Sequence, residues 1–134
     1  PPMVYGKGCK GNYQVLKSIA EKLPLFPETN NKRSLIYIDN LCSFVKLAVN
    51  MQLSGYYFPQ NNEYVNITSM AKAIRIAQNK RFHKSRFLGA CAKLGTRFSI
   101  KLEKAFGSLC YEGTENMNYS YCVVDNDESF KRSV

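Results

Sequence analysis

Apolar residues recur at helical spacing along most of the chain, and a stripe with a period of about 3.6 residues is the buried face of an amphipathic helix. Short polar residues stand before four of the predicted helices, where a side-chain oxygen can cap the first free N–H groups. We therefore expect about five helices, with N-caps at Asn12, Asp39, Thr68 and Asp127. Apolar stripes fall within residues 15–23, 41–49, 70–77 and 98–109, and a last short helix is expected at 128–132. The apolar run 87–94 fits a helix or a strand, and we favour a helix.

Short β-type patterns separate these helices. Residues 33–38 alternate between two faces, as a strand does. We also expect strands at 56–58 and 64–67 and a strand or an extended segment at 121–124, and residues 3–5 resemble the end of a strand that begins earlier. Residues 24–32 contain two prolines and two adjacent asparagines, so this segment is predicted to be a loop.

The order of these elements is α, β, α, β, β, α, α, β, α. It predicts a single domain over residues 1–134, of mixed α/β class and of α+β type as an isolated segment. The length fits one domain, and 45% hydrophobic with 22% charged residues favours a packed core over disorder. No apolar run approaches the roughly 20 residues that span a bilayer, and no secretory signal opens the chain.

The net charge of +9 indicates an anionic partner, either a nucleic acid or an anionic substrate. Much of this charge lies in residues 80–86, the segment KRFHKSR. We interpret this basic segment as a solvated loop with favourable charge near a helix end, in preference to an anion site.

The cysteines and the single histidine do not predict a metal site. The five cysteines are widely spaced without a C-x-x-C motif, and His83 has no cysteine or carboxylate at ligand spacing. Free thiols are typical of an intracellular protein, so we expect a cytoplasmic location and no metal.

Residues 6–11 form a glycine-rich loop, but a dinucleotide site also needs a complete βαβ unit and an acidic residue about 20 positions further on. Neither is present. A P-loop and a serine triad are absent as well, so we assign no catalytic residue. Tyr13 and Lys17 have Y-x-x-x-K spacing, but they fall within the first predicted helix, and we attribute the spacing to chance.

Three segments resemble the extended short-chain dehydrogenase/reductase family, which includes NDP-sugar epimerases and dehydratases. Residues 2–8 (PMVYGKG) are similar to its P-x-x-V-Y-G-P-G motif, with Lys7 in place of the proline. Residues 32–40 (KRSLIYIDN) are similar to its R-[DS]-[FL]-[IV]-[YH]-[VI]-[DE]-[DN] motif. Residues 104–111, with the later 123–125, resemble the family's C-terminal end. The family's G-x-x-G-x-x-G loop and its Y-x-x-x-K pair lie upstream of the V-Y-G motif and have no counterpart here.

The resemblance implies that the chain is the C-terminal, nucleotide-sugar-binding portion of an NAD-dependent epimerase or dehydratase. Arg33 matches the arginine that binds the substrate diphosphate, and Asn12 is a second candidate for the nucleotide sugar. Val4 and Tyr5 would lie near the NAD nicotinamide of a complete enzyme, and this portion alone is not expected to hold NAD tightly. The implied partners are the nucleotide sugar and an N-terminal Rossmann domain that precedes this segment.

Two alternatives remain open. The first alternative is that the chain is a small basic module that binds RNA or single-stranded DNA, with nine tyrosines and eight phenylalanines available for stacking. The strands at 3–5 and 56–58 also predict unpaired edges, through which the segment would form a homo-oligomer or exchange strands.

Overall fold

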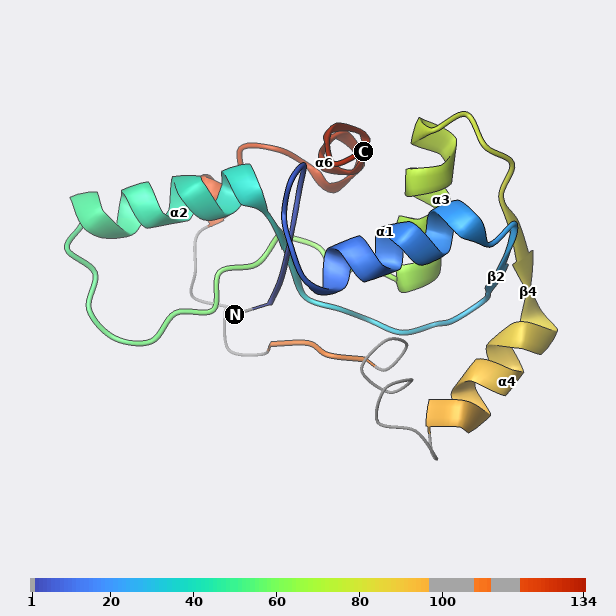
Figure 1. The fold of residues 1–134 in the computed structure, drawn as a ribbon. Helices are drawn as coiled ribbons and strands as arrows, with labels where there is room; N and C mark the ends of the chain where they lie inside the picture. The colour runs from blue at the N-terminus through green and yellow to red at the C-terminus, as the bar shows by residue number, and fades with distance from the viewer. Residues whose placement is uncertain (1, 97–107, 112–118) are drawn as a thin grey trace.

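The computed structural model describes residues 2–96, 108–111 and 119–134 (Figure 1). Within these residues it contains five α-helices and four strands, which form two parallel two-stranded sheets. The mixed α/β class predicted from the sequence is therefore confirmed. The strands are β1 (Met3–Tyr5), β2 (Leu25–Pro27), β3 (Leu35–Tyr37) and β4 (His83–Ser85). The helices are α1 (Asn12–Lys22), α2 (Ile38–Asn50), α3 (Ile67–Ala77), α4 (Arg86–Thr96), α6 (Asn126–Arg132) and the 3-10 helix η1 (Tyr119–Tyr121).

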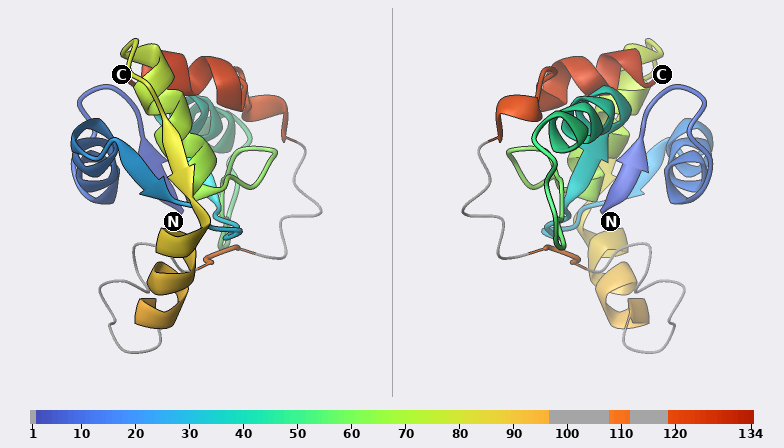
Figure 2. Two further views of the ribbon diagram at one scale, coloured as in Figure 1. Left: turned by 90° about the vertical axis from the view of Figure 1, so that its right-hand side faces the viewer. Right: turned by 90° about the vertical axis from the view of Figure 1, so that its left-hand side faces the viewer.

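The first sheet pairs β1 with β3 in parallel. Val4 lies opposite Ile36, and Tyr5 lies opposite Tyr37. The glycine-rich loop and α1 follow β1, whereas α2 begins directly after β3. Figure 2 shows this pair in its right-hand view and the second sheet, β2 with β4, in its left-hand view.

The second sheet corrects two predictions. β2 lies in the segment 24–32 and β4 in the basic segment 80–86, both of which we expected to be loops. The two strands pair in parallel, and the Glu28 N–H extends the ladder by donating to the Ser85 carbonyl over 3.0 Å. Three-residue strands are too short to show a two-residue period, and Pro27 stands at the end of β2, where a missing donor is tolerated.

Two predicted strands do not form in the described segment between α2 and α3. Residues 56–58 have no strand partner, and Tyr56 is 98% exposed. Of residues 64–67, only Val65 pairs, in a single antiparallel bridge with Arg33. Aromatic and β-branched composition alone therefore gave the wrong prediction, because a strand also needs a neighbour to complete its hydrogen bonds.

Residues 121–124, predicted as a strand or an extended segment, do not form a strand. Tyr121 ends η1 instead, and its hydroxyl accepts from the Gln60 N–H at 3.1 Å and donates to the Gln60 carbonyl at 2.7 Å. This buried pair of bonds satisfies the loop backbone through a side chain, so no strand ladder is required there.

The helix N-caps lie one or two residues before the predicted positions. The structure places them at Gly11, Tyr37, Asn66 and Asp125 instead of Asn12, Asp39, Thr68 and Asp127. Asn66 and Asp125 cap through their side chains, whereas α1 and α2 begin without a side-chain cap. β3 runs into α2 without a loop, which moves Asp39 into the first turn of that helix.

The main core lies between β1, β2, β3, α1, α3 and α6, and a second cluster of Ile36, Phe44 and Tyr121 lies between β3, α2 and η1. The largest fully buried apolar side chains of the two clusters are those of Tyr5, Tyr13, Tyr121, Phe26, Leu35, Ile36, Ile67, Met70 and Ile74. The predicted helical stripes are only partly buried. Val15, Val45 and Val49 are 59%, 52% and 70% exposed, so the outer parts of α1 and α2 pack against nothing in the described structure.

A buried amide network joins the two ends of the chain. The Asn61 side-chain oxygen accepts from the Tyr37 N–H and from the Asn40 amide, at 3.1 and 3.0 Å. Its NH2 group donates to the Tyr5 hydroxyl at 3.0 Å and to Asn126 at 2.6 Å. Asn61 thereby connects β1, β3, α2 and α6.

A buried arginine joins α1 to α3. The Arg75 Nη1 group donates to the carbonyls of Ala20, Glu21 and Leu23 at 2.9, 3.3 and 3.0 Å, and its Nε donates to the Arg81 carbonyl at 2.6 Å. The three Nη1 acceptors are carbonyls at the end of α1, where a cation is favourable. The two helices are in contact, and Figure 1 shows α1 crossing α3.

α4 confirms the helix favoured for residues 87–94, and it approaches β2 closely at Gly89. A Cβ added at Gly89 would lie 2.1 Å from the Glu28 carbonyl oxygen. The predicted helix over 98–109 lies mostly outside the described residues. None of the described helices has the length and apolar character needed to cross a membrane.

Replacing Asn61 with alanine is expected to lower the free energy of unfolding by roughly 3 kcal/mol, because it leaves buried donors and acceptors without partners. Asn62→Ala is the matched control, because that neighbouring side chain is exposed. Urea unfolding measures the free energy of unfolding of both variants. Equal stability of the two variants would show that the amide network does not hold the fold.

Gly89→Ala is expected to destabilise the protein by about 1–3 kcal/mol, because the new methyl group meets backbone rather than a movable side chain. The direction of the change in stability tests this contact, because replacing glycine with alanine in an ordinary helix interior stabilises a protein by about 1 kcal/mol. Thermal unfolding shows whether Gly89→Ala destabilises or stabilises the protein. Cys91→Ala, at an exposed position on the same helix, is the control. A stabilised Gly89→Ala protein would contradict the close approach of α4 to β2.

Candidate functional site

The glycine-rich loop makes a tight turn at the carboxyl end of β1. The Cys9 N–H donates to the Gly6 carbonyl at 3.2 Å, and Gly6 has a φ of 154°. A Cβ on Gly6 would lie 2.6 Å from Cγ2 of Ile38, the first residue of α2. Glycine at this position therefore lets the loop pack directly on the start of α2.

Asn12 and the loop lysines are on the surface. Asn12 is the first residue of α1, its side chain is exposed, and it does not cap the helix. Lys7 and Lys10 are exposed in the preceding loop. The loop thus presents positive charge beside a helix start that has no side-chain cap.

Tyr5 is part of the core. Its hydroxyl forms a 2.5 Å hydrogen bond with the Ser129 hydroxyl and accepts from Asn61, and burial raises its pKa to about 12. Val4, on the opposite face of β1, is half-buried and packs against the cluster that contains Ile36. Tyr5 therefore offers no exposed surface within the described structure.

Tyr13 and Lys17, which have the Y-x-x-x-K spacing, both contact the C-terminus. The Tyr13 hydroxyl donates to the Ser133 side chain or carbonyl, and Lys17 Nζ donates to the Val134 carbonyl at 3.1 Å. Burial raises the pKa of Tyr13. These contacts give the two residues a structural role in attaching α1 to the chain end.

Arg33 is buried, with 7% of its surface exposed. Its backbone exchanges two 3.0 Å hydrogen bonds with Val65 and forms a parallel bridge with Leu109. Desolvation lowers the pKa of its guanidinium group. Arg33 precedes β3 and so lies at the amino end of the β1–β3 pair, whereas the glycine-rich loop leaves at the carboxyl end. The structure therefore does not place Arg33 and Asn12 on one open surface.

A polar pocket of about 390 Å³ lies between the second sheet and the start of α3. It is lined by Glu28, Thr29, Asn30, Asn66, Thr68, Ser69, Lys72, Phe82 and Lys84. All but Phe82 carry a polar or charged side chain, so the pocket is suited to a hydrophilic ligand.

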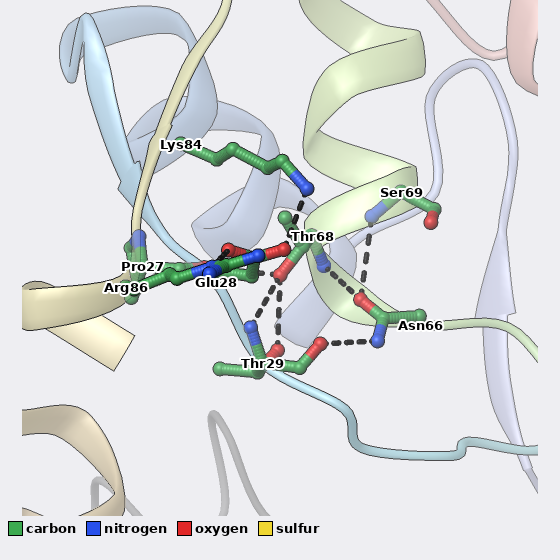
Figure 3. A network of polar contacts seen from close by, with 8 residues as sticks. All are labelled: Pro27, Glu28, Thr29, Asn66, Thr68, Ser69, Lys84 and Arg86. Carbon is green, nitrogen blue, oxygen red and sulfur yellow. Dashed lines mark hydrogen bonds and ion pairs between the residues drawn. The ribbon is translucent and has the colours of Figure 1, made fainter. Parts of the chain in front are cut away.

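Internal hydrogen bonds fix the walls of the polar pocket (Figure 3). The Thr68 hydroxyl donates to the Pro27 carbonyl and accepts from the Thr29 N–H, both at 3.0 Å. The Asn66 side chain donates to the Thr29 carbonyl and accepts from the N–H groups of Thr68 and Ser69. The first N–H groups of α3 are thus already occupied by the Asn66 cap.

Charged groups surround one wall of the pocket. Glu28 Oε1 lies 2.5 Å from Lys84 Nζ, and Glu28 Oε2 lies 3.4 Å from Arg86 Nε. The hydrogen bond from Lys84 is the main reason why the pKa of Glu28 is lowered. Lys72, on α3, forms no ion pair within the described residues.

The sequence analysis did not identify this pocket. Its residues come from two segments about 40 positions apart and from the basic segment, which we interpreted as a solvated loop. The two lysines and the cap Asn66 carry no motif that would have singled them out. Among the described residues, no group of three histidines, cysteines or carboxylates could hold a metal ion.

Comparison of the chain with models of protein families, with curated proteins and with solved structures gives no match. The function must therefore be inferred from the chain's own residues. The paired strands β1 and β3, the buried Arg33 and the polar pocket are the features from which this inference can be made.

Proposed function

We propose that the chain is the substrate-binding portion of an NAD-dependent nucleotide-sugar epimerase or dehydratase, and that Arg33 contacts the diphosphate of the substrate. The observation that carries this proposal is the pairing of two of the three segments on which the family resemblance rests, residues 2–8 and 32–40. They are about 30 residues apart in the sequence, yet Val4 and Tyr5 lie beside Ile36 and Tyr37 in one parallel register.

Arg33 suits the proposed diphosphate contact for electrostatic reasons. Guanidinium stays charged in proteins and can donate two parallel hydrogen bonds to phosphate oxygens. At 7% exposure it lies in a region of low dielectric, where attraction to an anion is stronger than in water. Its backbone bonds to Val65 hold it in place before a ligand arrives.

The chain's own contribution in this proposal is substrate binding. NAD, when bound in the complete enzyme, would accept and return the hydride. Tyr5 is fully buried and its hydroxyl is occupied by Ser129 and Asn61, so its side chain does not fit a nicotinamide contact. We derive no catalytic step from the described residues.

Arg33→Ala is expected to weaken the binding of UDP-glucose by about tenfold to a hundredfold, the loss that removal of a charged hydrogen-bond donor produces. Isothermal titration calorimetry measures the affinity. The exposed Arg81→Ala is the matched control, because it removes the same charge and should bind as the unaltered chain does.

Because Arg33 is buried, circular dichroism must first show that the variant is folded. If Arg33→Ala unfolds, the affinity of Arg33→Lys is measured instead. Lysine keeps the charge and loses the two parallel hydrogen bonds of the guanidinium group, so this variant should also bind more weakly. Unchanged affinity in a folded variant, or no binding by the unaltered chain, would overturn the proposal.

A second candidate function is the binding of single-stranded nucleic acid, and it is favoured by the exposed aromatic segment. Tyr56, Tyr57 and Phe58 are 98%, 39% and 41% exposed, and Phe58 stacks on Tyr111 with ring centroids 5.4 Å apart. Exposed aromatic rings on a positively charged protein can stack with the bases of a single strand of any sequence.

This second candidate predicts that an oligothymidine binds with an affinity that falls steeply as salt rises. Tyr56→Ala should weaken binding by about fivefold to a hundredfold through the loss of one stacking platform, whereas Tyr56→Phe should retain it. Fluorescence anisotropy over a salt series measures both effects. Equal affinities for the alanine and phenylalanine variants would exclude stacking on Tyr56.

A further inference from the structure

We propose that the polar pocket between the second sheet and α3 binds a small phosphate monoester with a hydroxyl-bearing body. The proposal does not depend on nucleotide-sugar binding at Arg33, because it is based on different side chains. The pocket volume of about 390 Å³ falls near the lower end of the range for small-molecule sites, which begins at roughly 300 Å³.

The charge around the pocket favours a doubly charged anion. Among the lining residues, Lys72 and Lys84 contribute two positive charges and Glu28 contributes one negative charge. Arg86 is not a lining residue, but it pairs with Glu28 and raises the local net charge to +2. A phosphate monoester carries about −1.5 to −2 at neutral pH, so it would balance this charge. A neutral sugar would leave this net positive charge unbalanced.

Three lining side chains are available to a ligand. Those of Asn30, Ser69 and Lys72 are exposed and make no hydrogen bond or ion pair within the described part of the chain. They supply an amide, a hydroxyl and an ammonium group, which together can bind hydroxyl groups of the ligand as well as a phosphate oxygen. The α3 N-terminus does not add to this set, because the Asn66 cap occupies its first N–H groups.

The remaining walls give the pocket a fixed shape. Phe82 is half-buried against Phe26, with ring centroids 6.3 Å apart, and offers an apolar face to the C–H side of a sugar ring. The contacts among Thr29, Asn66 and Thr68 hold the polar wall (Figure 3). A wall that is already ordered loses little conformational entropy when a ligand binds.

Glucose 6-phosphate is the probe for this site. We expect saturable changes in the ¹H–¹⁵N amide signals of Ser69, Lys72 and Lys84 when the full chain is titrated. Lys72→Gln should weaken binding by about tenfold or more, because it removes one charged donor. Lys131→Gln on α6 is the matched control with the same loss of charge, and it should not change the affinity.

The comparison ligands decide the outcome. Binding of glucose 6-phosphate that is clearly tighter than that of inorganic phosphate or glucose supports the site. Equal binding of inorganic phosphate would overturn the assignment of a hydroxyl-bearing ligand, and equal binding of glucose would overturn that of an anion. No signal change at these residues, or the same loss of affinity in Lys131→Gln, would overturn the site itself.

Discussion

The buried amides of Asn40 and Asn61 form the interaction on which the arrangement of the first sheet depends. Asn61 accepts from the Tyr37 N–H at the end of β3, and its own N–H donates to the Leu35 carbonyl at 2.7 Å. Asn40 exchanges two hydrogen bonds with the Val124 backbone, at 2.9 and 3.0 Å. A side-chain amide can thus satisfy backbone groups that a third strand would otherwise satisfy. The network is fully hydrogen-bonded, which is the condition under which buried polar groups specify a single arrangement.

Such side-chain bonds are necessary because the sheets are small. A two-stranded sheet of three-residue strands has little stability of its own and needs packing from neighbouring elements. Arg75 supplies part of that packing for the second sheet, since it binds the end of α1 and the Arg81 carbonyl just before β4. The Tyr5 and Ser129 hydroxyls similarly attach the first strand to the last helix. The polar contacts therefore join elements that are far apart in the sequence.

Helices were predictable from the sequence where a stripe of apolar residues is long enough to show its period, as in α1, α2 and α3. β2 and β4 were not predictable, because three residues show no period and their pairing joins segments nearly 60 positions apart. The caps were displaced because the chain enters α2 directly from β3 and because Asn66, not Thr68, turns its side chain onto the open N–H groups. The burial of Arg33 was not predictable either, since Val65 and Leu109, with which its backbone forms bridges, lie far from it in the sequence. The pocket residues lack a local motif, so only the tertiary structure shows that they share a site.

Both proposed ligand contacts depend on the same backbone alignment. The segment that contains Thr29, Asn31 and Arg33 runs antiparallel to the one that contains Val65, Ile67 and Thr68. Arg33 and Val65 form the bridge of this alignment, whereas Ile67 and Thr68 already belong to the first turn of α3 and are reached through side-chain hydrogen bonds. A displacement of residues 29–33 along these partners would therefore move Thr29 from the pocket wall and Arg33 from its bridge together. The Asn31 side-chain oxygen, which accepts from the Ile67 N–H at 3.1 Å, lies between these two positions and holds the register. The geometry of the pocket and that of Arg33 are consequently linked, although different side chains carry the two proposals.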